Sequence, residues 1–167
     1  ISLLVEVLEG AKNIGILMGE EASLRMPLED FEKLRSKIDG TFSDCSKIIK
    51  KVRLIKSEKE ILILKNICSV ANRSFDRANR LFFSGQPLNE AFREFKITLL
   101  EEGAEEVPYL VGGAGRDGYV DVISPPSSKP LENGDILMLD TGSTLKGYFC
   151  DFDRNWAIGT ASDIAKR

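Results

Sequence analysis

The chain has 167 residues, of which 43% are apolar and 29% are charged, so it can bury the core of one medium domain or two small ones. Its net charge of −3 lacks the basic excess of nucleic-acid binders and of proteins that attach to anionic membranes, and no apolar run is long enough to span a bilayer. The absence of histidine excludes a Ser–His or Cys–His hydrolase within this chain, and three widely spaced cysteines favour a reducing, cytoplasmic setting over a disulfide framework.

The first 55 residues predict a small unit that mixes helices and strands. Residues 1–10 are typical of a helix end closed by glycine, and the apolar run 13–18 favours a short strand. The apolar spacing over 28–38, directly after a proline, predicts a helix. A polar connector is expected over 41–46, and a strand or an extended segment over 48–55.

Two long helices are predicted next. The first begins at a capping box formed by Ser57 and Glu60, and its helical period continues to about Phe83. The second follows a proline and ends at a glycine, after which short β-prone runs begin. Helices and strands in separate blocks favour an α+β architecture, with the chain divided into residues 1–55 and 56–167.

A β-hairpin is predicted near the C-terminal end. The apolar run from Ile136 to Asp140 is typical of a buried strand. Lys146 and Gly147 suit a tight turn, and the next strand begins at Tyr148 and continues to about residue 158.

Three aspartates of this hairpin are the candidate functional residues. Asp140 ends the apolar strand, while Asp151 and Asp153 share one face of the next strand, about 7 Å apart at a rise of ~3.4 Å per residue. A short hairpin brings Asp140 and Asp151 side by side, where two ionised carboxylates repel unless one is protonated or a cation lies between them. Carboxylate oxygens suit hard divalent ions such as Mg or Mn, and mixed sites also hold Zn, Co or Fe. The alternative is that they are ordinary turn and strand-end residues in water, which the apolar strand before Asp140 argues against.

The glycine-rich segment 111–118 resembles a phosphate-binding loop only superficially. It lacks the terminal Gly-Lys-Ser/Thr of that motif and is not followed by a predicted helix. We therefore do not expect it to bind a nucleotide.

The hairpin motif as a whole resembles that of the pita-bread metallohydrolases, which include methionine aminopeptidase, prolidase, aminopeptidase P and creatinase. The matching elements are Asp140-x-Gly, Gly147-Tyr148 and Asp151-x-x-Arg154, with the second aspartate eleven positions after the first. Upstream, the segment 53–61 resembles the junction into the catalytic domain of the prolidase and aminopeptidase P branch. By this resemblance, residues 1–55 are the end of a creatinase-type N-terminal domain and 56–167 are the first half of a pita-bread domain.

The resemblance implies a Xaa-Pro aminopeptidase or dipeptidase that hydrolyses the amide bond next to proline. Asp140 and Asp151 would bind two divalent metal ions of the Mn, Co, Zn or Fe type, and Asp153 would be an additional ligand or lie just behind the ligands. The remaining ligands of the family, one histidine and two glutamates, come later in the sequence than this chain extends, so we expect a C-terminally truncated fragment that is inactive alone. A short peptide or another small molecule is the expected substrate, and the full-length protein is expected to be a cytoplasmic homodimer.

Two positions depart from the pattern of the family. Asp153 stands where the family usually has threonine, and Ile123 stands where the peptidases carry a histidine, seventeen residues before the first metal aspartate. One alternative is therefore the same fold with non-peptidase chemistry on a small cationic substrate, as in creatinase or the lyases of dimethylsulfoniopropionate. Another alternative is a metal-free binding module, although two mutually repelling acids have no purpose in such a module.

Overall fold

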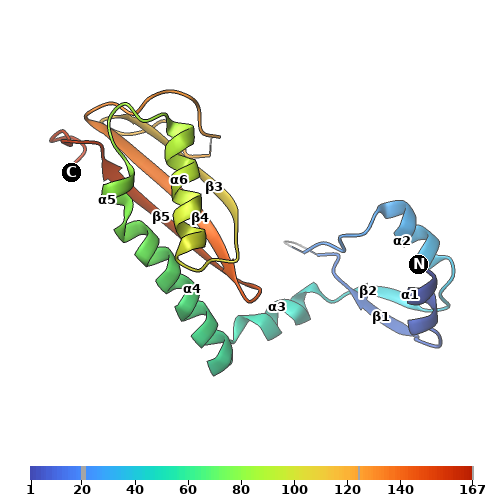
Figure 1. Ribbon diagram of the computed structural model, residues 1–167. Coiled ribbons are helices and arrows are strands. Elements are labelled where there is room, and N and C mark those ends of the chain that lie inside the picture. The colour runs from blue at the N-terminus through green and yellow to red at the C-terminus, as the bar shows by residue number, and fades with distance from the viewer. Residues whose placement is uncertain (20–21, 124, 167) are drawn as a thin grey trace. The chain divides into compact units, whose positions relative to one another are not determined.

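The computed structural model describes residues 1–19, 22–123 and 125–166, and it divides into two compact units, Ile1–Lys56 and Ser57–Arg167 (Figure 1). None of the described helices combines the length and the apolar character that a membrane crossing requires. Each unit has helices and strands of its own, so the expected mixed architecture is confirmed.

The described residues of the first unit form a two-stranded parallel sheet and three short helices. Its elements are α1 (Ser2–Val7), β1 (Asn13–Ile16), α2 (Leu28–Arg35), β2 (Thr41–Asp44) and α3 (Ser46–Leu54). β1 and β2 pair from Asn13 opposite Thr41 to Ile16 opposite Asp44. Phe31 of α2 packs edge-on against Phe42 of β2, with the ring centroids 5.5 Å apart.

Two predictions for this unit are wrong. The segment expected as a polar connector contains β2, because β1 offers it a parallel partner: the Thr41 amide donates to the Lys12 carbonyl at 2.8 Å. The segment over 48–55 is mostly the helix α3 rather than a strand. Its β-branched residues favour a strand locally, but the spacing of Ile48, Ile49 and Val52 is helical.

The second unit places two long helices against a three-stranded antiparallel sheet. Its elements are α4 (Glu58–Asp76), α5 (Ala78–Leu81), α6 (Leu88–Glu101), β3 (Glu106–Arg116), β4 (Asp135–Leu145) and β5 (Tyr148–Ala157), with the strand order β3-β4-β5. The predicted capping box is confirmed, since Ser57 Oγ accepts from the Glu60 amide and the Glu60 carboxylate accepts from the Ser57 amide at 2.7 Å. The second predicted helix is also confirmed and follows Pro87 directly.

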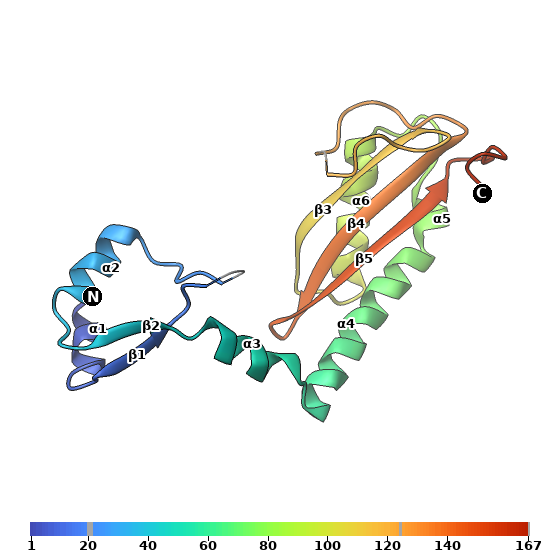
Figure 2. The ribbon, with the colours of Figure 1, turned by 180° about the vertical axis from the view of Figure 1, so that it is seen from behind.

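The core of this unit lies between the helices and one face of the sheet. Figure 1 shows α4 and α6 in front of the strands, and Figure 2, from behind, shows the sheet in front of the helices. Phe95 of α6 is fully buried and meets Phe75 and Trp156 at centroid distances of 4.9 and 6.2 Å. Alternate residues of each strand point to the opposite face, where no described helix packs, and that face carries the candidate site.

β5 has the predicted extent, whereas β3 and β4 are longer than the sequence predicts. β3 runs without a break through its glycines, because they allow close approach: a Cβ on Gly112 would lie 2.0 Å from the Met138 carbonyl oxygen of β4. β4 continues past Asp140 to Leu145, so the expectation that Asp140 ends its strand is wrong. Asp140 therefore lies in the middle of a strand that has a neighbour on each side.

Candidate metal centre

The three candidate aspartates lie on the uncovered face of the sheet. Asp140 pairs with Asp153 across the hairpin, and Asp151 pairs with Gly142. The residue directly opposite Asp140 is therefore Asp153, and Asp151 is its diagonal neighbour. All three carboxylates project from the same face, as the alternation of side chains along a strand requires.

Tyr109 joins two of these carboxylates. Its hydroxyl lies 3.0 Å from Asp140 Oδ1 and also contacts Asp151 Oδ1. Tyr109 reaches them because β3 pairs with β4 and places it opposite Gly142. Asp140 and Asp151 thus converge as the sequence predicts, but they do so around a residue that the sequence analysis missed.

The phenol of Tyr109 has a single proton for two carboxylates. Burial raises the pKa of this phenol above its ordinary value of 10, and the hydrogen bonds to Asp151 and Asp140 raise it further. The hydroxyl therefore stays protonated through the neutral range, and it donates to one aspartate at a time. The carboxylate that does not receive this hydrogen bond at a given moment remains free to accept one from another donor.

An aromatic ring holds Tyr109 in this position. Phe149 lies on the same face of β5, and its ring is tilted by 32° against that of Tyr109 at a centroid distance of 6.0 Å. The Phe149 ring covers Gly142 so closely that a Cβ added there would lie 1.8 Å from its Cζ atom. The absence of a side chain at Gly142 therefore makes room for the Phe149 ring beside the carboxylates.

The carboxylates line a small hollow of about 160 Å³ together with Phe152. Asp151 and Asp153 are exposed and Asp140 is half-buried, so the oxygens are accessible from solvent. Among the described residues, no three His, Cys, Asp or Glu side chains are close enough together to form a metal site. The oxygens of Asp140 and Asp151 are the type of ligand that a hard divalent cation prefers, and they would supply part of its ligand shell.

Other residues singled out from the sequence lie away from the carboxylates. Cys150 points to the covered face, where it is buried in the core and its sulfur is 3.3 Å from Ser143 Oγ. Ile123 lies in the connection between β3 and β4 with 75% of its surface exposed. Its amide donates to Asp121 Oδ1 at 3.1 Å, and its side chain has no group that handles protons.

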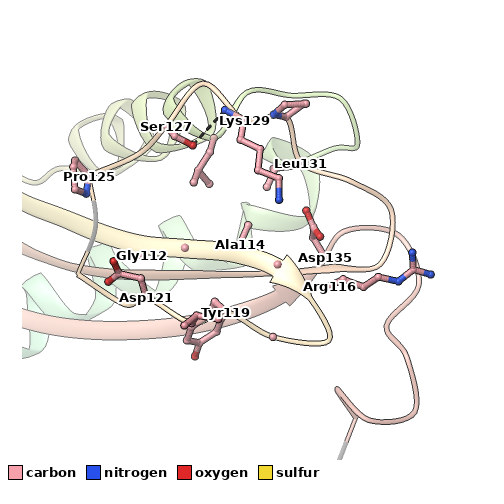
Figure 3. A pocket seen from close by; sticks show the side chains of 16 residues that line it. Gly112, Ala114, Arg116, Tyr119, Asp121, Pro125, Ser127, Lys129, Leu131 and Asp135 are labelled. Atoms are coloured by element: carbon pink, nitrogen blue, oxygen red, sulfur yellow. Dashed lines mark hydrogen bonds between the residues drawn. The ribbon is translucent and has the colours of Figure 1, made fainter.

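A larger hollow of about 590 Å³ lies along β3 and the loop that follows it (Figure 3). Figure 3 shows the side chains of Lys129 and Asp135 directed into this space, whereas Arg116 points away from it. Its lining does not include Asp140 or Asp151. The glycine-rich segment lines it as a strand and a turn, and the next described element is the strand β4 rather than the helix that follows a phosphate loop.

Comparison with known proteins identifies the family. The sequence model of metallopeptidase family M24 matches residues 63–167, which is more than half of the chain. The Xaa-Pro dipeptidase of Pyrococcus horikoshii is 27% identical over 164 residues, covering 96% of this chain and 44% of that protein.

Solved structures of the same kind match both units. The Xaa-Pro dipeptidase from Bacillus anthracis has a TM-score of 0.83 at 26% identity, with 98% of this chain and 46% of that chain covered. The X-Pro aminopeptidase from Thermotoga maritima has a TM-score of 0.80 at 27% identity, with 97% and 45% covered. The chain thus spans about half the length of the relatives that it matches, and its fold is that of a creatinase-type and pita-bread fragment, as the resemblance implied. The chain belongs to metallopeptidase family M24.

Proposed function

We propose that the whole protein is a metal-dependent peptidase that cleaves the bond before proline in short peptides. The single observation that carries the proposal is the convergence of Asp140 and Asp151 on the hydroxyl of Tyr109, on the open face of a sheet whose fold matches Xaa-Pro peptidases. The names of the relatives support the same substrate class, since they include Xaa-Pro dipeptidases and an X-Pro aminopeptidase.

In this proposal Asp140 and Asp151 hold divalent cations of the Mn, Co, Zn or Fe type. When bound, a pair of such ions would supply a Lewis acid for the peptide carbonyl and would lower the pKa of a metal-bound water molecule to near neutrality. The chain's own contribution is to fix the two carboxylates in place. Tyr109 orients them through its hydroxyl, and the packing of Phe149 on Gly142 limits the motion of the phenol ring.

The two aspartates leave most of a coordination shell unfilled, which supports an incomplete site in this chain. Zinc takes four ligands and manganese six, so two carboxylates need further protein ligands or water. We expect the remaining ligands in other parts of the whole protein, and we expect this chain by itself to bind metal weakly and to lack peptidase activity.

The test compares peptide hydrolysis by the purified full-length protein before and after metal removal. We expect Ala-Pro to be cleaved much faster than Ala-Ala, activity to disappear with a chelator, and activity to return with Mn²⁺, Co²⁺ or Zn²⁺. Asp151→Asn should abolish the activity, while Asp76→Asn should not change it, because Asp76 is exposed on the helical side of the sheet. Turnover of creatine or dimethylsulfoniopropionate without cleavage of Ala-Pro would overturn the peptidase proposal.

A further inference from the structure

Asp153 is the third carboxylate that lines the small hollow. It is exposed, it lines the hollow with Asp140 and Asp151, and it lies directly opposite Asp140. In the part of the chain that the structure describes, its carboxylate makes no hydrogen bond and no ion pair, in contrast to the other two aspartates, which share Tyr109.

The positively charged side chain of the next residue, Arg154, points away from this carboxylate. Arg154 projects to the opposite face of β5, where its guanidinium lies 5.6 Å from the ring centre of Phe75 and 5.4 Å from that of Phe152. Among the described residues, its contact with Asp153 is the hydrogen bond that Nη1 donates to the backbone carbonyl oxygen. In the described part of the chain Arg154 therefore forms no ion pair with the Asp153 carboxylate.

This arrangement carries an electrostatic cost in the absence of a cation. Side chains directly opposite on antiparallel strands have Cβ atoms about 5 Å apart, and like charges there destabilise the pair. Asp140 and Asp153 stand in this relation, with Asp151 two residues along the same strand. A bound cation converts the repulsion among the three carboxylates into attraction.

We propose that Asp153 raises the affinity of the Asp140–Asp151 pair for divalent cations through its negative charge. The inference rests on the proposed metal site, and it assigns to Asp153 an electrostatic role rather than a place among the directly bound ligands. The proposal makes Asp153 a positioning residue for metal and not a catalytic residue.

Coulomb's law sets the size of the effect. A unit charge about 6 Å from a dication in a water-like medium changes an affinity by about tenfold. Because the Asp153 side chain is exposed, salt weakens this contribution, and a Debye length of about 10 Å at 0.1 M ionic strength leaves most of it in place. At about 1 M salt the contribution should fall to about threefold or less.

The experiment measures binding of Mn²⁺ to the metal-depleted full-length protein, by calorimetry and by the loss of the electron paramagnetic resonance signal of free Mn²⁺. Asp153→Asn removes the charge with little change in shape and should weaken binding about tenfold at low salt. Asp153→Glu keeps the charge and should stay within about threefold of the unmodified protein. Asp76→Asn removes an equal charge on the helical side of the sheet and should leave binding unchanged.

The outcomes separate this proposal from the metal site itself. Weaker binding in Asp153→Asn alone, with a smaller difference at high salt, supports the electrostatic role. Unchanged binding in Asp153→Asn, while Asp140→Asn loses Mn²⁺, overturns the role of Asp153 and leaves the metal site standing. Full affinity in Asp140→Asn overturns the metal site, and the proposal for Asp153 fails with it.

Discussion

Replacing Tyr109 with phenylalanine tests the hydroxyl that joins the two aspartates. The substitution keeps the ring that packs against Phe149 and removes only the donor to Asp140 and Asp151. One proton serves two acceptors, so the loss amounts to a single hydrogen bond to a charged group, about 1.5–3 kcal/mol when fully buried. Because Asp151 is exposed and Tyr109 is only half-buried, we expect the metal-free protein to lose about 1–2 kcal/mol of unfolding free energy.

The stabilisation by the Tyr109 hydroxyl should depend on pH in a definite direction. The pKa of Tyr109 is raised in the folded protein above its ordinary value of 10, so the folded state keeps the proton where the unfolded state releases it. The stabilisation is therefore complete below pH 10 and is lost as the pH rises from there toward the raised pKa. The difference between the unmodified protein and Tyr109→Phe should be constant from pH 7 to 9 and shrink above pH 10.

Urea unfolding followed by the fluorescence of the single tryptophan, Trp156, measures both quantities in the presence of a chelator. Trp156 stacks on Phe75 in the core of the same unit, so its signal reports on the unit that contains Tyr109. Equal stability of the two proteins at pH 7 would refute the role of the hydroxyl. A difference that grows above pH 10 would refute the direction of the pKa shift.

Two further predictions concern the packing of Phe149 on Gly142 beside the site and the ion pairs that Glu102 forms with Arg73 and Arg77. Gly142→Ala should lower the free energy of unfolding, measured in urea, by about 1–3 kcal/mol, because the new Cβ would overlap the ring of Phe149. This loss should largely vanish when Phe149 is also replaced by leucine, and an equal loss in both backgrounds would contradict the overlap. Glu102 accepts from Arg73 at 2.8 Å and from Arg77 at 3.2 Å, and these bonds lower the pKa of its carboxyl below the ordinary 4.5. The stabilisation of the folded state by ionised Glu102 is present above about pH 4.5 and is lost as the pH falls through the lowered pKa. In Glu102→Gln the free energy of unfolding should therefore decrease less steeply between pH 5 and 3 than in the unmodified protein. An unchanged pH dependence would contradict this prediction.

Local chemistry in the sequence determines many elements of this protein. The capping box at Ser57 starts α4 because it satisfies orphan backbone amides without help from distant residues. Lys146 and Gly147 both adopt positive φ, at 51° and 77°, which is the conformation of a tight hairpin turn and makes the hairpin recognisable from sequence. The spacing of Asp151 and Asp153 likewise fixes that they share one face.

Tertiary pairing decides the elements that local preference describes wrongly. β2 is a strand because β1 lies beside it, and a polar run such as Thr41–Asp44 carries no sign of that partner. α3 contains β-branched residues that favour strands, yet it is a helix. Both errors arise because the conformation depends on spacing and on neighbours more than on the preference of each residue.

The same division holds for the candidate site. The sequence identifies Asp140 and Asp151 as a pair that a short hairpin brings side by side. The observed register pairs Leu145 with Tyr148, so that Asp153 lies opposite Asp140 and Asp151 is the diagonal neighbour. Tyr109 could not be found in this way, because it is 31 residues from Asp140 and reaches the site only through the pairing of β3 with β4. A turn fixes the register of adjacent strands locally, whereas a strand separated by a long connection takes its register from the packed sheet, so only the tertiary structure brings the phenol to the carboxylates.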